Sequence, residues 1–152
     1  MIAELEIFLI AMTPIFELRG SIPAALSVYD LSIWSAYFIS VVGNLVPVVF
    51  ILLLLESVSG YLGRHSQLFS RFFTWLFERT RRKHEAKFER WQEFALVIFV
   101  AIPLPFTGAW TGSLCAFVFG IPFKKAFPLI SFGVIIAGLI VTLASLGIIN
   151  FI

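Results

Sequence analysis

Hydrophobic and polar positions divide the chain into long uncharged stretches separated by short charged ones. Residues 31–55 and 126–152 carry no charged side chain over 25 and 27 positions. A helix needs about 20 apolar residues to cross the hydrocarbon core of a bilayer, which is about 30 Å thick. The pattern therefore predicts two membrane-spanning helices, over residues 31–56 and 126–150.

Two further apolar stretches, residues 3–29 and 94–122, are interrupted near their centres by prolines and glycines. Proline removes a backbone donor and clashes with the preceding turn, so neither stretch is expected to form one continuous helix. Each arm has about 10 residues, or about 15 Å of helix, which reaches only the middle of the membrane. We therefore expect two re-entrant helical hairpins. Their predicted tip residues are Pro14, Gly20, Pro23, Pro103, Pro105, Gly108 and Gly112.

A simpler structure stays open for each hairpin. The first stretch could be an interfacial helix followed by a loop, and the second could be one long, kinked crossing helix. A secretory signal peptide is not expected at the start, because residues 1–18 contain no Lys or Arg.

The charged side chains are unevenly placed along the chain. Residues 60–93 contain eight basic and four acidic side chains, a net charge of +4, and Lys124 and Lys125 precede the last predicted helix. Because cytoplasmic loops carry the Lys/Arg excess, residues 60–93 and 124–125 are predicted to be cytoplasmic. The N-terminus, Asp30 and Asn150 should then face outside, and the two hairpins should enter from opposite sides. Within the cytoplasmic segment, the apolar side chains of residues 67–78 recur at helical spacing, and polar side chains fill the other face. This pattern predicts an amphipathic helix in the membrane surface.

Composition excludes an ordinary soluble domain. The chain is 60% hydrophobic and 13% charged, whereas soluble domains are about half apolar and about a quarter charged. The whole chain, residues 1–152, is interpreted as one all-α integral membrane domain. Its halves, residues 1–59 and 94–152, each contain a hairpin and then a spanning helix, in opposite orientations. Broken segments at matching places in two inverted halves are typical of a transporter's central site.

Glu17 and Arg19 are the charged side chains predicted to lie in the middle of a membrane element, where a charge costs about 2.5–3.5 kcal/mol. They could pair with each other, or with backbone carbonyls, and only hold the hairpin tip. Alternatively, the planar guanidinium of Arg19 suits phosphate or carboxylate, and Glu17 in a low-dielectric site suits proton coupling. The second tip would add hydroxyl groups and an indole N–H, and the first spanning helix could line the same cavity. These further candidates are Thr107, Trp110, Thr111 and Asn44.

The sequence shows no nucleophile–base arrangement, no phosphate loop and no cluster with metal-ligand spacing. Enzyme activity, a metal and a cofactor are therefore not expected. The charged stretch between the halves has no groove-reading motif, so nucleic-acid binding is not expected either.

Two segments carry a resemblance to a known family. Residues 14–23 (PIFELRGSIP) and 101–112 (AIPLPFTGAWTG) resemble the two signatures of the prokaryotic small multidrug export proteins, which look distantly related to DedA-like membrane proteins. The resemblance implies re-entrant hairpins in an inverted repeat, and some members of the wider group are linked to moving lipid carriers such as undecaprenyl phosphate. This chain has Phe106 where the family commonly has glycine.

Three functional hypotheses follow. The first is a transporter in the cytoplasmic membrane that binds an anionic head group, such as a lipid phosphate, at Arg19, with Glu17 coupling the step to protons. The second is proton-coupled export of cationic or hydrophobic compounds. The third is a membrane scaffold that transports nothing. Membrane lipids are the expected partners, together with a small-molecule substrate or protons. A homodimer is a further expectation, because two spanning helices and two hairpins bury little surface within one protomer.

Overall fold

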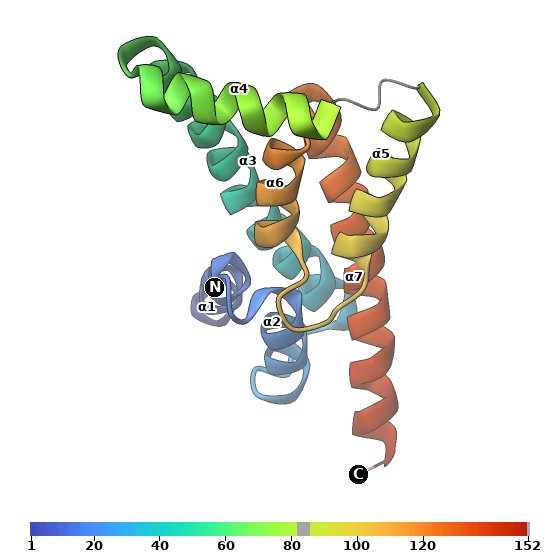
Figure 1. Ribbon diagram of the computed structural model, residues 1–152. Helices are drawn as coiled ribbons and strands as arrows, with labels where there is room; N and C mark the ends of the chain where they lie inside the picture. The colour runs from blue at the N-terminus through green and yellow to red at the C-terminus, as the bar shows by residue number, and fades with distance from the viewer. Residues whose placement is uncertain (82–85, 152) are drawn as a thin grey trace.

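The chain is all-helical. The computed structural model describes residues 1–81 and 86–151, which form seven α-helices (Figure 1). Within these residues, Ile33–His65 and Phe123–Ile148 are long and apolar enough to cross a membrane, as the sequence predicts. The helices are α1 (Ile2–Met12), α2 (Glu17–Ser27), α3 (Ile33–His65), α4 (Gln67–Arg81), α5 (Ala86–Ala101), α6 (Ala109–Val118) and α7 (Phe123–Phe151).

The long helix α3 extends beyond its predicted end. It begins after Ser32, whose hydroxyl accepts a hydrogen bond from the Ser35 N–H at 3.2 Å. Its 33 residues correspond to about 50 Å of helix. The predicted end at residue 56 is wrong: two glycines between there and His65 each cost about 1 kcal/mol, which does not break a helix. The helix ends at Ser66, whose backbone is extended.

The second hairpin was predicted to start at residue 94, and this start is also too late. Helix α5 begins at Ala86, inside the segment that carries the charges. Glu, Lys and Arg are good helix formers, so charge alone does not mark a helix boundary.

Four short helices form two pairs. Residues 13–16 connect α1 to α2, and residues 102–108 connect α5 to α6. In Figure 1 the first pair lies in the lower half of the molecule and the second in the upper half, with the α5–α6 loop reaching down to α2. Helix α1 is seen nearly end-on whereas α2 runs down the page, so this pair is an open bend. Helices α5 and α6 pack against each other, which does not fit a single kinked crossing helix.

The two halves contact each other reciprocally. Helix α1 packs against α3, and α5 packs against α7. The second short helix of each half also contacts the long helix of the other half, α2 with α7 and α6 with α3. The main core therefore forms where both halves meet. Its buried members include Leu18, Ile22, Val41, Val48, Leu96, Val100, Ile130 and Val134.

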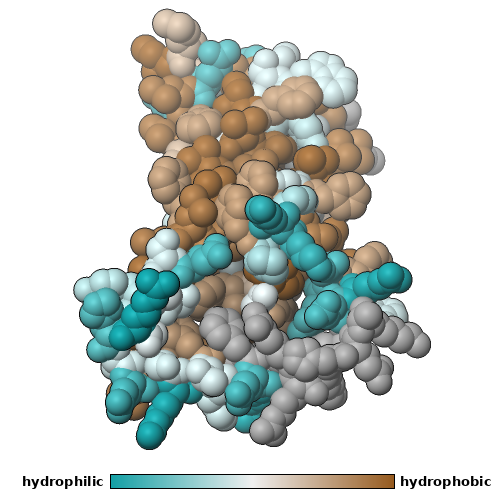
Figure 2. All heavy atoms as spheres, turned by 90° about the horizontal axis from the view of Figure 1, so that it is seen from above, coloured by the Kyte–Doolittle hydropathy of each residue, from teal (hydrophilic) through white to brown (hydrophobic). Residues whose placement is uncertain are grey.

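The amphipathic segment forms a helix that lies across one end of the molecule. In Figure 1, α4 crosses above the other helices, and its Phe73 ring meets Phe117 of α6 edge-on at 6.2 Å. Large apolar side chains on α4 remain exposed, Leu68 and Trp75 among them. Figure 2, which looks onto this end, shows hydrophilic side chains gathered on one side and apolar ones on the other. Part of the predicted basic stretch, Arg82, Lys83, His84 and Glu85, lies outside the described residues.

Candidate functional site

Glu17 links the two helix pairs. It is the first residue of α2, its side chain is 5% exposed, and its backbone has φ 42°, a left-handed conformation that is unfavourable for a residue with a side chain. Its carboxylate accepts a hydrogen bond from the backbone N–H of Trp110, at 3.3 Å, in the first turn of α6. The N-terminus of a helix favours negative charge because its first N–H groups have no partner within the helix. Glu17 of one pair therefore caps α6 of the other.

Gly108 makes this contact sterically possible. It precedes α6 with φ 144°, and a Cβ added there would lie 2.0 Å from Oε2 of Glu17. Any side chain would therefore displace the carboxylate. Trp110 donates a second bond in the same direction, from its indole N–H to the carbonyl of Met12 at 3.2 Å. These two hydrogen bonds hold the two bends together.

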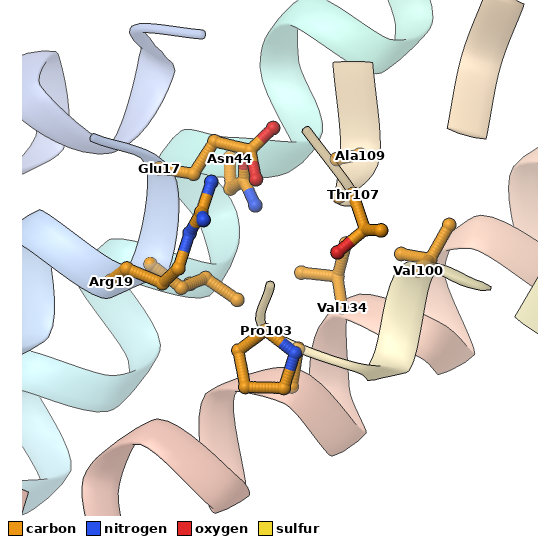
Figure 3. Close-up of a pocket in the computed structure, with 11 residues that line it drawn as sticks. Glu17, Arg19, Asn44, Val100, Pro103, Thr107, Ala109 and Val134 are labelled. Atoms are coloured by element: carbon orange, nitrogen blue, oxygen red, sulfur yellow. The ribbon is translucent and has the colours of Figure 1, made fainter. Parts of the chain in front are cut away.

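Arg19 lies beside this contact without an ion-pair partner. It lines a small cavity of about 10 Å³, about the space of one water molecule, together with Glu17 and Asn44. Figure 3 shows the side chains of Arg19, Glu17 and Asn44 directed toward this space. The ion pairs in the described part of the chain, at the N-terminus and between Lys125 and Glu93, do not include Arg19. Glu17 and Arg19 therefore form no direct ion pair, although the guanidinium is near enough to act electrostatically on the carboxylate.

Asn44 brings an unsatisfied polar group to the cavity. This residue of α3 is 1% exposed, and its Oδ1 has no hydrogen-bond partner among the described residues. A buried polar atom without a partner costs about 1–3 kcal/mol. Its amide therefore retains the capacity to bind a polar ligand or water in the cavity.

The loop between α5 and α6 is held by Thr107. Its hydroxyl lies 2.6 Å from the carbonyl of Ile102 and accepts the N–H of Leu104 at 3.1 Å. Thr107 lines the cavity, but these bonds already engage its hydroxyl. Phe106, in the same loop, is 89% exposed and has φ 67°, a conformation that glycine adopts more easily than phenylalanine.

Two other predicted binding residues lie away from the cavity. Trp110 is bound to Met12 through its indole, and the Thr111 hydroxyl lies 3.4 Å from the carbonyl of Gly108. Neither residue lines the cavity in this structure.

The predicted tip residues are divided between several places. Pro103 and Gly108 line the cavity. Pro14 and Pro105 are exposed in the two connections. Three residues lie within helices, where Gly20 packs against Phe16, Gly112 packs against Val100, and α2 continues through Pro23.

Two polar residues near the site were not predicted from the sequence. Ser21 of α2 and Ser40 of α3 are both 0% exposed, and neither hydroxyl has a hydrogen-bond partner in residues 1–81 and 86–151. Each lies four residues from a predicted candidate, Ser21 from Glu17 and Ser40 from Asn44. Residues four apart share one face of a helix, so this spacing was the available signal.

Comparison with known proteins places the chain in a family. No curated protein and no solved structure matches it. The family described as "putative small multi-drug export protein" matches residues 17–140, which include Glu17, Arg19, Asn44 and the whole α5–α6 pair. The chain therefore belongs to the small multi-drug export protein family, and its two long apolar helices are those of a membrane protein.

Proposed function

We propose that this protein is a membrane transporter that binds an anionic head group, such as a lipid phosphate, at Arg19. The observation that carries the proposal is the position of Arg19, which lines a cavity where the two helix pairs meet and has no ion-pair partner among the described residues. A guanidinium offers a planar set of donors that matches phosphate or carboxylate. The amide of Asn44 lies in the same cavity and would add a neutral hydrogen-bonding group.

Glu17 would control access of the anion to this site. The α6 N-terminus favours an anion, and the Glu17 carboxylate accepts its Trp110 N–H. When Glu17 takes up a proton, its negative charge is lost and its attraction to the helix N-terminus weakens. A substrate anion could then interact with both α6 and Arg19. Proton uptake by Glu17 and binding of the anion would in this way be coupled.

The two helix pairs would act as opposed re-entrant hairpins in an inverted repeat. The reciprocal contacts of α2 with α7 and α6 with α3 support this arrangement, as does the position of the pairs in opposite halves of the molecule (Figure 1). Residues 60–93 and 124–125 would be cytoplasmic and both termini would lie outside. The exposed apolar side chains of α4, such as Leu68 and Trp75, would enter the inner membrane surface.

The proposal is tested in liposomes that contain a short-chain polyprenyl phosphate and a membrane-impermeant phosphate probe outside. The wild-type protein should expose the inner-leaflet pool to the probe, and Arg19→Ala should abolish this exposure. Glu17→Gln, which keeps an oxygen acceptor for the Trp110 N–H but cannot ionise, should make the residual rate independent of pH. Arg64→Ala is the matched control, because Arg64 is exposed at the end of α3. Wild-type rates in both site variants would contradict the proposal.

The family description favours a second candidate, proton-coupled export of cationic or hydrophobic compounds. In that case Glu17 would bind the cation or exchange it for a proton. The positive charge of Arg19 in the same cavity opposes a cationic substrate, so we place this function second. It predicts a proton flux that a cationic compound stimulates and that Glu17→Gln abolishes, whereas Arg19→Ala should increase it.

A further inference from the structure

Two stripes of buried side chains lie on α2 and α3, which pack against each other. Both stripes have a spacing of four residues, which keeps the members of each on one helix face. The stripe on α2 consists of Glu17, Ser21 and Ala25, and the stripe on α3 consists of Ala36, Ser40 and Asn44.

At each end of the stripes, a residue of α2 lies near a residue of α3. Glu17 and Asn44 line the same cavity, and Ala25 and Ala36 belong to the same buried cluster. Helices α2 and α3 pack together and are joined by only five residues, 28–32, so they run in opposite directions. This antiparallel register puts the middle members, Ser21 and Ser40, at matching levels of the two helices.

Three polar atoms of these stripes lack a hydrogen-bond partner among the described residues. Ser21 Oγ, Ser40 Oγ and Asn44 Oδ1 are buried and make no hydrogen bond in the described part of the chain. Other buried helix hydroxyls behave differently, because Ser113 and Ser145 bond the carbonyl four residues earlier, at 2.7 and 2.8 Å. Buried hydroxyls are almost always paired with protein or with ordered water. Ordered water is thus the partner that these three unpaired groups would take.

We propose that Ser21, Ser40 and Asn44 hold a file of water molecules and that this file is the proton path of Glu17. Buried water typically makes about three hydrogen bonds to otherwise unsatisfied groups. A hydroxyl both donates and accepts, so each water or serine can accept one proton and release another. One proton that enters at the serine end thus ends on the Glu17 carboxylate, and no charge stays on the path. This inference rests on the proposed function only in requiring that Glu17 takes up a proton.

The surroundings of Glu17 agree with a single entry route. Arg19 is the charged side chain that shares its cavity, while α6 contributes backbone N–H groups and α3 the neutral amide of Asn44. Helices α5 and α7 contribute only apolar lining, Val100, Val134 and Ala137. At the far end, Ala25 and Ala36 are both 0% exposed, so they close the path in this conformation. Protons would enter when α2 and α3 separate there.

The test measures how fast Glu17 takes up a proton after a pH jump, in protein reconstituted into lipid nanodiscs. The readout is the infrared carbonyl stretch of the protonated carboxyl, assigned by its loss in Glu17→Gln. Replacing both serines, Ser21→Ala with Ser40→Ala, should slow proton uptake about tenfold or more, and each single variant should slow it less. Ser145→Ala is the matched control, because that hydroxyl is buried but already bonded, and its rate should equal that of the wild type.

Two results would overturn the proposal. One is an unchanged rate in the double variant accompanied by a higher unfolding temperature, since removal of dry, unpaired hydroxyls stabilises a protein. The other is absence of any titrating band that depends on Glu17. Failure of the proposed function looks different: the wild type would move no polyprenyl phosphate, while Glu17 would still protonate quickly and the double variant slowly.

Discussion

Glu17 and Gly108 are the residues on which the junction between the helix pairs depends. The Glu17 carboxylate caps α6 only because Gly108 has no side chain, since a Cβ there would lie 2.0 Å from Oε2. The left-handed backbone of Glu17 adds strain at the same point. Strained backbone is typical of functional sites, where the surrounding structure compensates for its cost of about 1–3 kcal/mol.

Gly108→Ala should therefore lower the free energy of unfolding by about 2–4 kcal/mol, because it combines an unfavourable φ of 144° with a clash. The measurement is chemical unfolding in detergent followed by circular dichroism. Gly147→Ala is the control, because nothing lies within 4 Å of the added atom and alanine is the better helix former. Equal stabilities of the two variants would contradict the geometry at Gly108.

A substitution at Phe106 should stabilise the protein, in contrast to Gly108→Ala. Its φ of 67° is unfavourable for any residue except glycine, and its side chain is 89% exposed, so replacement loses little packing. Phe106→Gly should raise the free energy of unfolding by about 0.5–1 kcal/mol. Leu104→Gly in the same loop, where no positive φ is relieved, should lower it. A destabilised Phe106→Gly variant would show that the phenyl ring contributes more than the backbone strain costs.

Between elements, glycines determine how closely the helices of the second half approach. A Cβ added at Gly112 of α6 would lie 2.4 Å from Cγ2 of Val100 in α5, and one added at Gly133 of α7 would lie 2.7 Å from Cβ of the same valine. Val100 is thus enclosed by two glycines on neighbouring helices. Small residues at such contacts let membrane helices pack closely.

Gly112→Ala should lower the free energy of unfolding by about 1–3 kcal/mol, because it overpacks this contact. In a Val100→Ala background the same change should cost less, by about 1 kcal/mol or more, since the colliding methyl group is gone. A double-mutant cycle from chemical unfolding measures this coupling. Strict additivity of the two changes would show that α6 moves freely away from α5.

Helix α1 is connected to the α2–α3 loop by a titratable contact. The Tyr29 hydroxyl donates to the Glu6 carboxylate, and this hydrogen bond raises the pKa of Tyr29 above its ordinary value of 10.0. Because the neutral phenol is favoured in the folded state, the contact stabilises below pH 10.0 and is lost as the pH rises through the raised pKa. Glu6→Gln should lower this pKa, as measured by the ultraviolet absorbance of tyrosinate. Tyr29→Phe identifies the transition, and an unshifted titration in Glu6→Gln would exclude the contact.

The whole molecule has one charged end and one nearly uncharged end, which determines how it should insert. Exposed basic side chains such as Arg64, Arg71 and Lys124 lie at or near the end crossed by α4, whereas Asp30 lies in the loop at the opposite end of α3. Positive charge is retained on the cytoplasmic side of membrane proteins. The reciprocal contacts between the halves would then place the cavity of Arg19 between the two membrane surfaces.

Single cysteines test this orientation in a Cys115→Ser background. Asp30→Cys should react with a membrane-impermeant maleimide only from outside the cell, and Lys124→Cys only in inverted vesicles. Detergent-solubilised protein provides the control for intrinsic reactivity. Labelling of both positions from one side would refute the proposed topology.

Local sequence information was sufficient to predict the helices, but it did not predict which helices pack against each other. Runs of apolar residues, helical periodicity and helix-breaking prolines act over a few residues, so they predicted the long helices α3 and α7, the breaks in both short pairs and the amphipathic α4. The paired motifs around Glu17 and Pro103 likewise indicated the family. Helix ends were less predictable, because α3 and α5 extend into segments that their charges suggested would be loops.

The tertiary structure alone decided which groups meet. Glu17 and Arg19 are two residues apart and line one cavity, yet the carboxylate binds the N–H of Trp110, 93 residues away. The matching levels of Ser21 and Ser40 follow from the antiparallel packing of α2 and α3, which neither helix specifies by itself. The sequence determined which segments are helical and apolar because those properties are local. The packing of the two halves determined the partner of Glu17, because a helix N-terminus can be capped by any carboxylate that the fold brings to it.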